Sequence, residues 1–380
     1  MATLEGRAVD RPAVSFYEVG GLTMDPSDPD LFNIYRDPSW HPLLALAEER
    51  TDLIRMRSPV RTQSHQAWDS PSTPSQGRRS DFFTTESHLD HGCRMTRTTL
   101  KIAGRVMTSL TRRDRDVDTI WTTEHLLKCP EDVEAYLQLP DEVFAETIDV
   151  SPLVEEEERL GERGIVMVDT EDPLCAAATL FSMEDFTILA MTQQDLFHRL
   201  LEKHARFIQY RTEQVAQQFP GHLWRIYGPE FATQPYLPPH LFDEYVVRYT
   251  GPMIEAIHRR GGFARVHIHG RIRNILDSVV RMGADAIDPI EPPPQGDVDL
   301  AFVRTEYGKD LVLFGNIEIA DVESAEPDRF EQIVRKALAD GTRGPGRGFV
   351  LMPSACPYGR TVSTRTLRNY ETMARCIEDF

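Results

Sequence analysis

The chain has 380 residues, of which 41% are hydrophobic and 27% charged, a composition that supplies a full core and excludes global disorder. Lys and Arg number 42 against 60 Asp and Glu, so the net charge of −18 opposes nonspecific binding to nucleic acid or anionic lipid. The length suits either two average domains or one barrel-sized domain. Because nothing forces a split, we expect one domain over residues 1–380.

The cysteines and the N-terminal sequence indicate a compartment. Five cysteines, an odd number without a CxxC pair, suit a reducing environment. MATLEGRAVDRP lacks the apolar core of a secretory signal, and no run of 18 apolar residues occurs. We therefore expect a cytoplasmic protein without a membrane partner.

The first half of the chain contains three candidate strands. They are AVSFYEV (13–19), TLKIAGRV (99–106) and GIVMVDT (164–170). The stretch at 62–80 is rich in Ser, Pro, Gln and Gly and is typical of an exposed loop, and EEEER (155–159) is typical of a solvated helix face.

The second half alternates short apolar runs with amphipathic helical stretches, as expected of βα units around a parallel sheet. The apolar runs are LWRIYG (223–228), FARVHI (263–268), DAIDPI (285–290), LVLFGN (311–316) and GFVLMP (348–353). Helices are predicted over 239–260 and 328–341, the second ending on a glycine.

Eight candidate strands with intervening helices predict an α/β fold, a (β/α)8 TIM barrel with N-terminal excursions. The chief alternative is an open doubly wound sheet. No GxGxxG follows the first strand, so a dinucleotide crevice has no support in the sequence. In a barrel of this kind the active site lies at the carboxyl ends of the strands.

The motif VHIHG (266–270) places two histidines at the end of a predicted strand. Side chains at i and i+2 share a face of a strand, so His267 and His269 point the same way, about 7 Å apart at the backbone. For an isolated HxH, the competing interpretation is one satisfied core histidine and one hydrogen-bonding residue at the rim.

Cys356 follows the last predicted strand and is a candidate third ligand at the same rim. Two imidazoles and one thiolate suit Zn²⁺, and three protein ligands leave the open position that catalytic zinc requires. A zinc hydrolase of the amidohydrolase type also uses HxH, but on its first strand and with later histidine ligands. This chain has no histidine after His269, which disfavours that class.

Six stretches, in order, resemble the uroporphyrinogen decarboxylase superfamily, and in particular its zinc methyltransferase branch. They are LEGRAVDRPAV (4–14), TEHLLKCPEDVEAYLQLP (123–140), residues 226–262, VHIHG, LFGNIE (313–318) and residues 346–373, which contain GFVLMPSACPYGRT. VHIHG falls where this branch carries HxCG.

The resemblance implies a zinc enzyme that moves a methyl group between a methylated small molecule and a corrinoid protein. The ligands of the branch carry over to His267, His269 and Cys356. The middle ligand departs from the pattern, because it is His rather than Cys. A site with two nitrogens and one sulfur suits Lewis-acid activation of a donor such as a methoxylated compound better than activation of a thiol.

The same resemblance leaves two alternatives open. One is a decarboxylase-like lyase for a carboxylated substrate, although the Arg-rich motif that this branch carries after its first strand is absent from YEVGGLTMDPSDPD (17–30). The other is a binding protein that keeps the barrel without catalysis.

Five further residues are weaker site candidates. Glu230 and Glu18, each near the end of a strand, are candidate catalytic acids or bases, and Glu230 is also a candidate fourth ligand. Asn316, Glu318 and Tyr358 are candidates for orienting the substrate.

Overall fold

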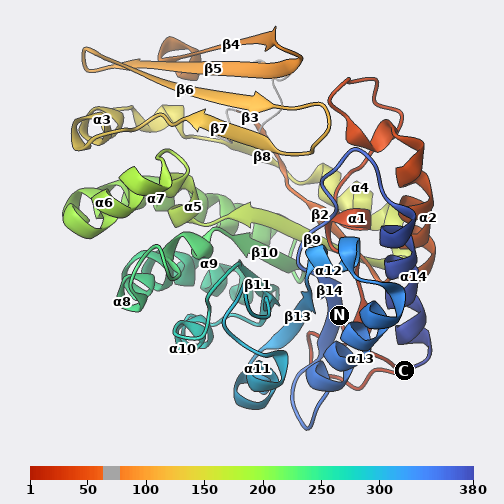
Figure 1. The fold of residues 1–380 in the computed structure, drawn as a ribbon. Coiled ribbons are helices and arrows are strands. Elements are labelled where there is room, and N and C mark those ends of the chain that lie inside the picture. Colours follow the sequence, from red (N-terminus) through yellow and green to blue (C-terminus); the bar gives the residue numbers. More distant parts are fainter. Residues whose placement is uncertain (63–77) are drawn as a thin grey trace.

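The computed structural model describes residues 1–62 and 78–380, and its centre is a curled sheet of eight parallel strands (Figure 1). The strands are β1 (Ala13–Val14), β2 (Leu53–Arg57), β9 (Gly164–Glu171), β10 (Leu223–Tyr227), β11 (Phe263–Ile268), β12 (Ala286–Pro289), β13 (Val312–Ile317) and β14 (Phe349–Pro353). Their order is β1-β14-β13-β12-β11-β10-β9-β2, so chain neighbours are also sheet neighbours, as in a TIM barrel. The predicted α/β class and parallel sheet are confirmed.

The two outermost strands, β1 and β2, are joined by one residue rather than by a strand ladder within the described residues. Asp52 donates its backbone N–H to the Val14 carbonyl oxygen at 2.8 Å. Its carboxylate accepts from the Val14 N–H at 2.8 Å and pairs with the Arg11 guanidinium at 2.8 Å.

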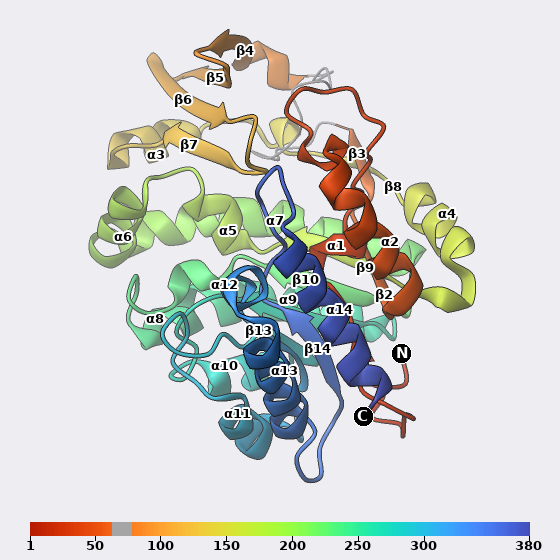
Figure 2. The same ribbon diagram turned by 45° about the vertical axis from the view of Figure 1, so that its right-hand side comes forward.

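Helices cover the outside of the curled sheet (Figures 1 and 2). The helices of the described chain are α1 (Glu18–Gly21), α2 (His41–Arg50), α3 (Pro130–Tyr136), α4 (Ser151–Leu160), α5 (Pro173–Ala178), α6 (Met183–Thr192), α7 (Gln194–Gln218), α8 (Pro239–Phe242), α9 (Arg248–Arg259), α10 (Leu276–Arg281), α11 (Leu300–Tyr307), α12 (Ile319–Ser324), α13 (Pro327–Gly341) and α14 (Thr364–Glu378). A π-helical stretch, Asp243–Val247, joins α8 to α9, so the predicted helix over 239–260 is confirmed, as is the one over 328–341.

Side-chain caps explain where several of these helices begin. The Asp172, Ser182 and Ser363 side chains accept from backbone N–H groups of the first turns of α5, α6 and α14.

A separate antiparallel sheet interrupts the barrel pattern early in the chain. Its strands are β4 (Phe83–Asp90), β5 (Cys93–Ile102), β6 (Arg105–Arg113) and β7 (Ile120–Glu124), and it lies to one side of the parallel sheet (Figure 1). A two-stranded ladder between β3 (Val60–Thr62) and β8 (Thr147–Asp149) lies where the chain passes between the parallel sheet and this region. The predicted N-terminal excursions correspond to these elements.

The prediction that residues 99–106 form a barrel strand is wrong. They span the end of β5, a two-residue turn and the start of β6. Ala103 and Gly104 both have positive φ, 51° and 74°, as a tight hairpin turn requires, so the apolar run folds back on itself.

The strand of the parallel sheet that the sequence analysis missed is β2, LIRMR. Arg55 and Arg57 interrupt its apolar residues, so the segment lacks the apolar run by which the other parallel strands were predicted. Arg55 is only 5% exposed, because its guanidinium reaches the carboxylates of Glu48 and Glu156.

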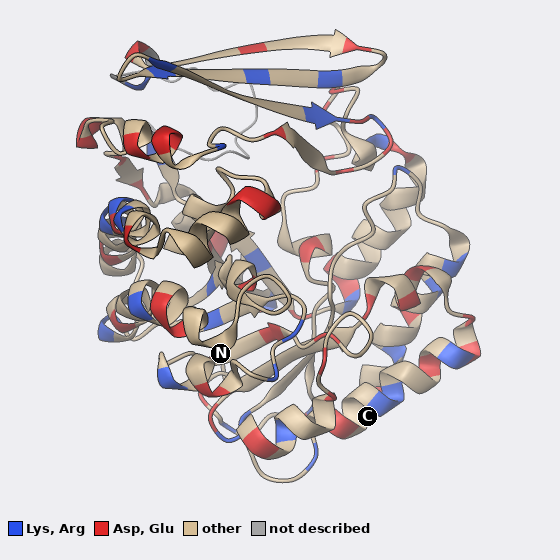
Figure 3. Ribbon diagram, turned by 60° about the vertical axis from the view of Figure 1, so that its left-hand side comes forward, with Lys and Arg blue, Asp and Glu red and all other residues tan. Residues whose placement is uncertain are grey.

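Three other observations bear on the sequence predictions. The predicted loop at 62–80 falls almost entirely on residues 63–77, outside the described part of the chain. EEEER lies on α4, and four of its five residues are exposed as expected, but Glu156 is buried against Arg55 and Arg57. The charge balance of the sequence is also visible on the surface. Figure 3 shows Lys and Arg interspersed with Asp and Glu along the outer helices.

Within the described residues, no helix is both long enough and apolar enough to span a bilayer. The prediction of a single domain over 1–380 stays a prediction.

Candidate functional site

The two histidines of VHIHG lie together at the mouth of the curled sheet, by which we mean the carboxyl ends of its eight strands. His267 is in β11 and is 3% exposed, and His269 follows the strand. Their ring centroids are 4.6 Å apart and their planes nearly perpendicular. The two rings are thus adjacent, and their convergence on one metal ion stays a prediction.

Each imidazole is held by its own carboxylate. The Nδ1 atom of His267 lies 2.7 Å from Asp288 Oδ2, and Nδ1 of His269 lies 2.7 Å from Glu291 Oε1. Glu291 also accepts from the Gly270 N–H at 2.6 Å, which fixes the carboxylate relative to the end of β11. Both histidines therefore have Nε2 left for another partner, the arrangement in which metal-binding histidines are usually found.

A buried arginine keeps the carboxylate behind His267 ionised. Burial opposes the ionisation of Asp288, but the Arg265 guanidinium, whose Nε lies 3.0 Å from Oδ1, holds its pKa at about 2. Burial, with a smaller contribution from Arg225, lowers the pKa of His267 to about 3. His267 is thus neutral, with Nδ1–H donating to Asp288 and an unprotonated Nε2.

The second histidine has the opposite tendency. Burial disfavours the charged imidazole, but the hydrogen bond and the charge of Glu291 raise the pKa of His269 above its usual value. The two rings therefore differ in basicity although they are adjacent.

Cys356 does not join the histidines in the described structure. Its backbone N–H donates to Glu18 Oε2 at 3.3 Å, and burial together with the Glu18 carboxylate raises the pKa of its thiol. Among residues 1–62 and 78–380, no three His, Cys, Asp or Glu side chains form a group able to hold a metal ion. The histidine pair thus fits a metal, whereas the complete set with Cys356 is not assembled.

Of the other predicted site residues, Glu230, Asn316 and Glu318 lie at or just beyond the carboxyl ends of β10 and β13. Burial raises the pKa of Glu230, which accepts from the Gly228 N–H at 3.0 Å. Burial, with the charge of Glu291 next in size, raises the pKa of Glu318 to about 7, and the Ser354 hydroxyl lies 3.4 Å from Glu318 Oε2. Asn316 is partly buried near the end of β13, whereas the Tyr358 side chain is 53% exposed.

The sequence interpretation missed the residues that support the histidines. Asp288 and Glu291 interrupt the apolar run DAIDPIEP, and acids inside a buried strand are the signal that would have found them. Tyr17 was also missed. Its ring stacks against His267 with centroids 5.9 Å apart.

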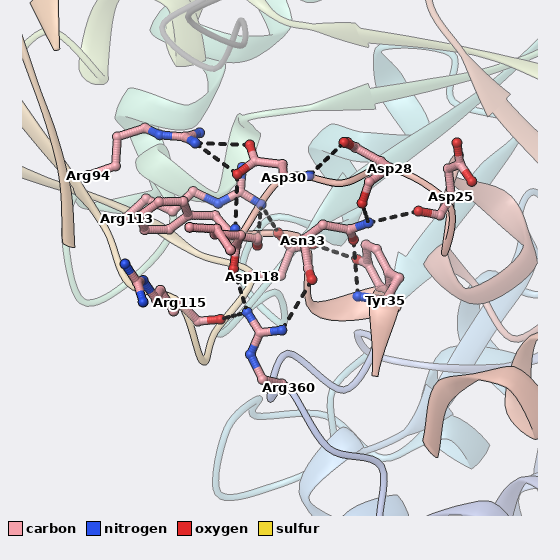
Figure 4. Close-up of polar contacts among 12 residues, drawn as sticks. Asp25, Asp28, Asp30, Asn33, Tyr35, Arg94, Arg113, Arg115, Asp118 and Arg360 are labelled. Atoms are coloured by element: carbon pink, nitrogen blue, oxygen red, sulfur yellow. Dashed lines mark hydrogen bonds and ion pairs between the residues drawn. The ribbon is translucent and has the colours of Figure 1, made fainter. Parts of the chain in front are cut away.

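A polar network ties the loop after Cys356 to the first 40 residues and to the antiparallel sheet (Figure 4). Arg360 donates to the carbonyl oxygens of Leu31, Asn33 and Arg115, the first two at 2.9 and 3.3 Å. Tyr35 donates its hydroxyl to Asp118 at 2.5 Å, and the Asp118 N–H donates to the Tyr358 carbonyl oxygen at 2.8 Å. The position of the Cys356 loop therefore depends on segments that are distant in the sequence.

Comparisons with known proteins agree with this architecture. Residues 119–375 match the model of the uroporphyrinogen decarboxylase (URO-D) family. A methyltransferase from Methanosarcina mazei is similar in fold, with a TM-score of 0.61 and 16% identity over 100% of this chain and 97% of that one. No curated protein matches the sequence. At 16% identity, the likeness to the solved structure establishes a shared fold.

Proposed function

The chain belongs to the uroporphyrinogen decarboxylase family, and we propose that it is a zinc-dependent methyltransferase. In this proposal a methyl group moves between a methylated small molecule, such as a methoxylated compound, and a corrinoid protein that docks over the mouth. The observation that carries the proposal is the histidine pair, with a carboxylate on each Nδ1 and both Nε2 atoms left over. The fold shared with a methyltransferase over the whole chain supports it.

His267, His269 and Cys356 are the residues proposed to hold the zinc ion. When bound there, zinc would act as a Lewis acid on the heteroatom that carries the methyl group. Asp288, kept ionised by Arg265, fixes the tautomer of His267 so that Nε2 presents its lone pair. Glu291 fixes the ring of His269 in the same way.

Acidic residues around the pair supply sites for protons. Glu18 lies against Cys356 and is placed to take the thiol proton when the thiolate forms. Glu318, with a pKa of about 7, is able to hold or release a proton near neutral pH. Glu230 remains a candidate acid or base, and Asn316 and Tyr358 remain candidates for orienting the substrate.

The alternative, a decarboxylase-like lyase, needs cations for substrate carboxylates. The two arginines inside the curled sheet near the mouth are already paired, Arg225 with Asp169 at 2.8 Å and Arg265 with Asp288 at 3.0 Å. This pairing favours the methyltransferase.

The test is elemental analysis of chelator-washed protein. We expect about one zinc per chain in the wild type and none in the His267→Ala, His269→Ala double variant. The matched control is His222→Ala, His258→Ala, which removes two histidines that also pair with carboxylates, at 2.8 and 2.7 Å, but that lie elsewhere. This control should keep its zinc.

Absence of zinc from reconstituted wild-type protein would refute the metal site and favour the metal-free lyase or a binding protein. If zinc is present, mixing with a methylated corrinoid protein should change the cobalt absorption, and the double variant should not produce this change.

A further inference from the structure

A side pocket lies beside the mouth, and its lining includes the ends of two strands, one of them next to the strand of His267. Glu171 and Tyr227, the last residues of β9 and β10, are neighbours in register, and Tyr227 is also the register partner of His267. The pocket is also lined by residues of α5 and α7, and by Tyr136 and Phe144 from the segment before β8.

The walls of this pocket are largely aromatic. Tyr136, Phe144, Phe207 and Tyr227 all line it, and the rings of Phe144 and Phe207 stack with centroids 5.3 Å apart. A second cavity borders the pocket at Phe144 and Phe207 and extends to Tyr210, which is 59% exposed. Such walls favour a flat apolar group.

The charges in the pocket are balanced. Arg211 pairs with Glu171 at 2.8 Å and with Glu146 at 3.3 Å, and Arg61 pairs with the same two acids at 3.5 and 3.9 Å. Although burial opposes ionisation, Arg211 and Arg61 hold the pKa of Glu171 at about 2. An anionic ligand would find each of these arginines already paired, so the pocket suits an uncharged one.

Two buried polar atoms of the lining residues have no hydrogen-bond partner in the described structure, namely Nε2 of His204 and Oε2 of Glu171. His204 is 7% exposed, and burial lowers its pKa to about 4, so its ring is neutral at pH 7. A buried polar atom without a partner is destabilising, and a ligand that supplies the partner recovers the lost free energy on binding. A hydroxyl group donates and accepts, so it can satisfy either atom.

We propose that this pocket binds an uncharged aromatic ring that carries a hydroxyl group, with the ring against the aromatic side chains that line the pocket and the hydroxyl toward His204 and Glu171. The ligand class follows from the pocket alone. That this ring belongs to the small molecule that gives or receives the methyl group rests on the proposed function, and the short path through Tyr227 to His267 is the reason for assigning it so.

The test is a calorimetric titration of the full-length, chelator-washed protein with phenol. No partner protein is present. Phenol should bind saturably. Benzoate should bind at least about tenfold more weakly because it brings a charge into the pocket, and cyclohexanol should bind more weakly because it cannot stack.

Two variants locate the binding. Ala176→Phe fills the pocket from α5 and should abolish phenol binding, whereas Ala301→Phe, at a partly buried position of α11 away from the pocket, should leave it unchanged. His204→Phe keeps a ring against Tyr136 but removes the nitrogen. It should weaken phenol about 3- to 10-fold and leave fluorobenzene unchanged.

Absence of saturable phenol binding by the wild type would overturn the proposal. If Ala176→Phe does not fold, the ratio of phenol to fluorobenzene affinity in His204→Phe decides, and an unchanged ratio overturns the proposal as well. If the protein binds zinc but not phenol, only the proposal for this pocket is overturned. If it binds phenol but not zinc, only the proposed metal site is overturned.

Discussion

Neighbouring acids at the mouth have very different pKa values because their surroundings differ. Asp288 faces the buried guanidinium of Arg265 and has a pKa of about 2, whereas Glu318 is buried, with Glu291 as an acidic neighbour, and has a pKa of about 7. At neutral pH the first is a fixed anion that orients His267, and the second is a group that exchanges a proton. Acids with such different pKa values near one another are typical of a functional site.

The raised pKa of Glu318 predicts a pH dependence of stability. Its usual pKa is 4.5, so between about pH 4.5 and 7 the folded state binds more protons than the unfolded state, and stability falls as the pH rises through this window. We expect Glu318→Gln to lose less stability than the wild type between pH 4.5 and 7.5, measured by urea unfolding. The control is Glu306→Gln, at an exposed position of α11, whose stability should depend on pH as in the wild type. If Glu318→Gln also showed the wild-type pH profile, the raised pKa of Glu318 would be contradicted.

The pairing of Asp288 with Arg265 predicts a large loss of folding stability when one of the two charged groups is removed. Arg265 is 1% exposed, so Asp288→Asn leaves a buried cation without its anion and should lower the free energy of unfolding by about 3–5 kcal/mol. Glu331→Gln is the control, because Glu331 pairs with Arg335 and Arg375, whose side chains are about half exposed. It should cost less than about 1 kcal/mol. Equal losses in the two variants would show that the buried pair is not special.

At the scale of elements, the hairpin turn between β5 and β6 divides residues 99–106 between two antiparallel strands. Ile102 pairs with Arg105, so only Ala103 and Gly104 form the turn, and both have positive φ. Glycine adopts this conformation without strain, but alanine does so at a cost of about 1–2 kcal/mol. The antiparallel sheet therefore forms despite a turn residue that is not optimal.

Replacing that residue should stabilise the hairpin. Ala103→Asn creates the Asn-Gly pair favoured in two-residue hairpin turns and should raise the free energy of unfolding by about 1 kcal/mol. Ala103→Val should lower it, since a β-branched side chain is disfavoured at positive φ. Amide hydrogen exchange in β5 and β6, slower in the first variant and faster in the second, is the measurement, and the reverse order would contradict the turn geometry.

At the scale of the whole molecule, Arg360 connects the end of the chain to its beginning. Its guanidinium donates to backbone oxygens of the segment before α2 and of the connection between β6 and β7, and its own carbonyl accepts from Trp40 Nε1 at 3.1 Å. Val117 and Gly359 add a β-bridge between the same regions. The Cys356 loop, the antiparallel sheet and the N-terminal segment are thereby held together.

Arg360→Ala should loosen these segments together and leave the histidine pair in place. We expect faster hydrogen exchange in residues 25–37, 114–119 and 356–362, with β11 and β12 unchanged. The control is Arg365→Ala. Arg365 lies at the start of α14, and its replacement removes an ion pair with Glu326. Hydrogen exchange in the three segments should not change in this variant. Faster exchange confined to 356–362 would show that the segments are not coupled.

Local patterns sufficed for much of the fold and for the centre of the site. Alternation of apolar strands and amphipathic helices predicts the parallel sheet, because strand and helix periodicities depend on neighbouring residues. The spacing of His267 and His269 likewise predicts that they share a face at the carboxyl end of a strand. The order of six stretches points to the family that the comparison establishes.

Contacts between distant segments decided the rest. Arg55 and Arg57 conceal β2 until Glu48 and Glu156 are seen beside them, and the hairpin in 99–106 becomes evident only with its strand partners. The carboxylates behind the histidines come from β12 and the loop after it, and the side pocket combines β9, β10, α5 and α7. A sequence pattern reports which face a side chain occupies. Which charge neutralises it, and which ring stacks on it, depend on packing that brings residues together across the fold.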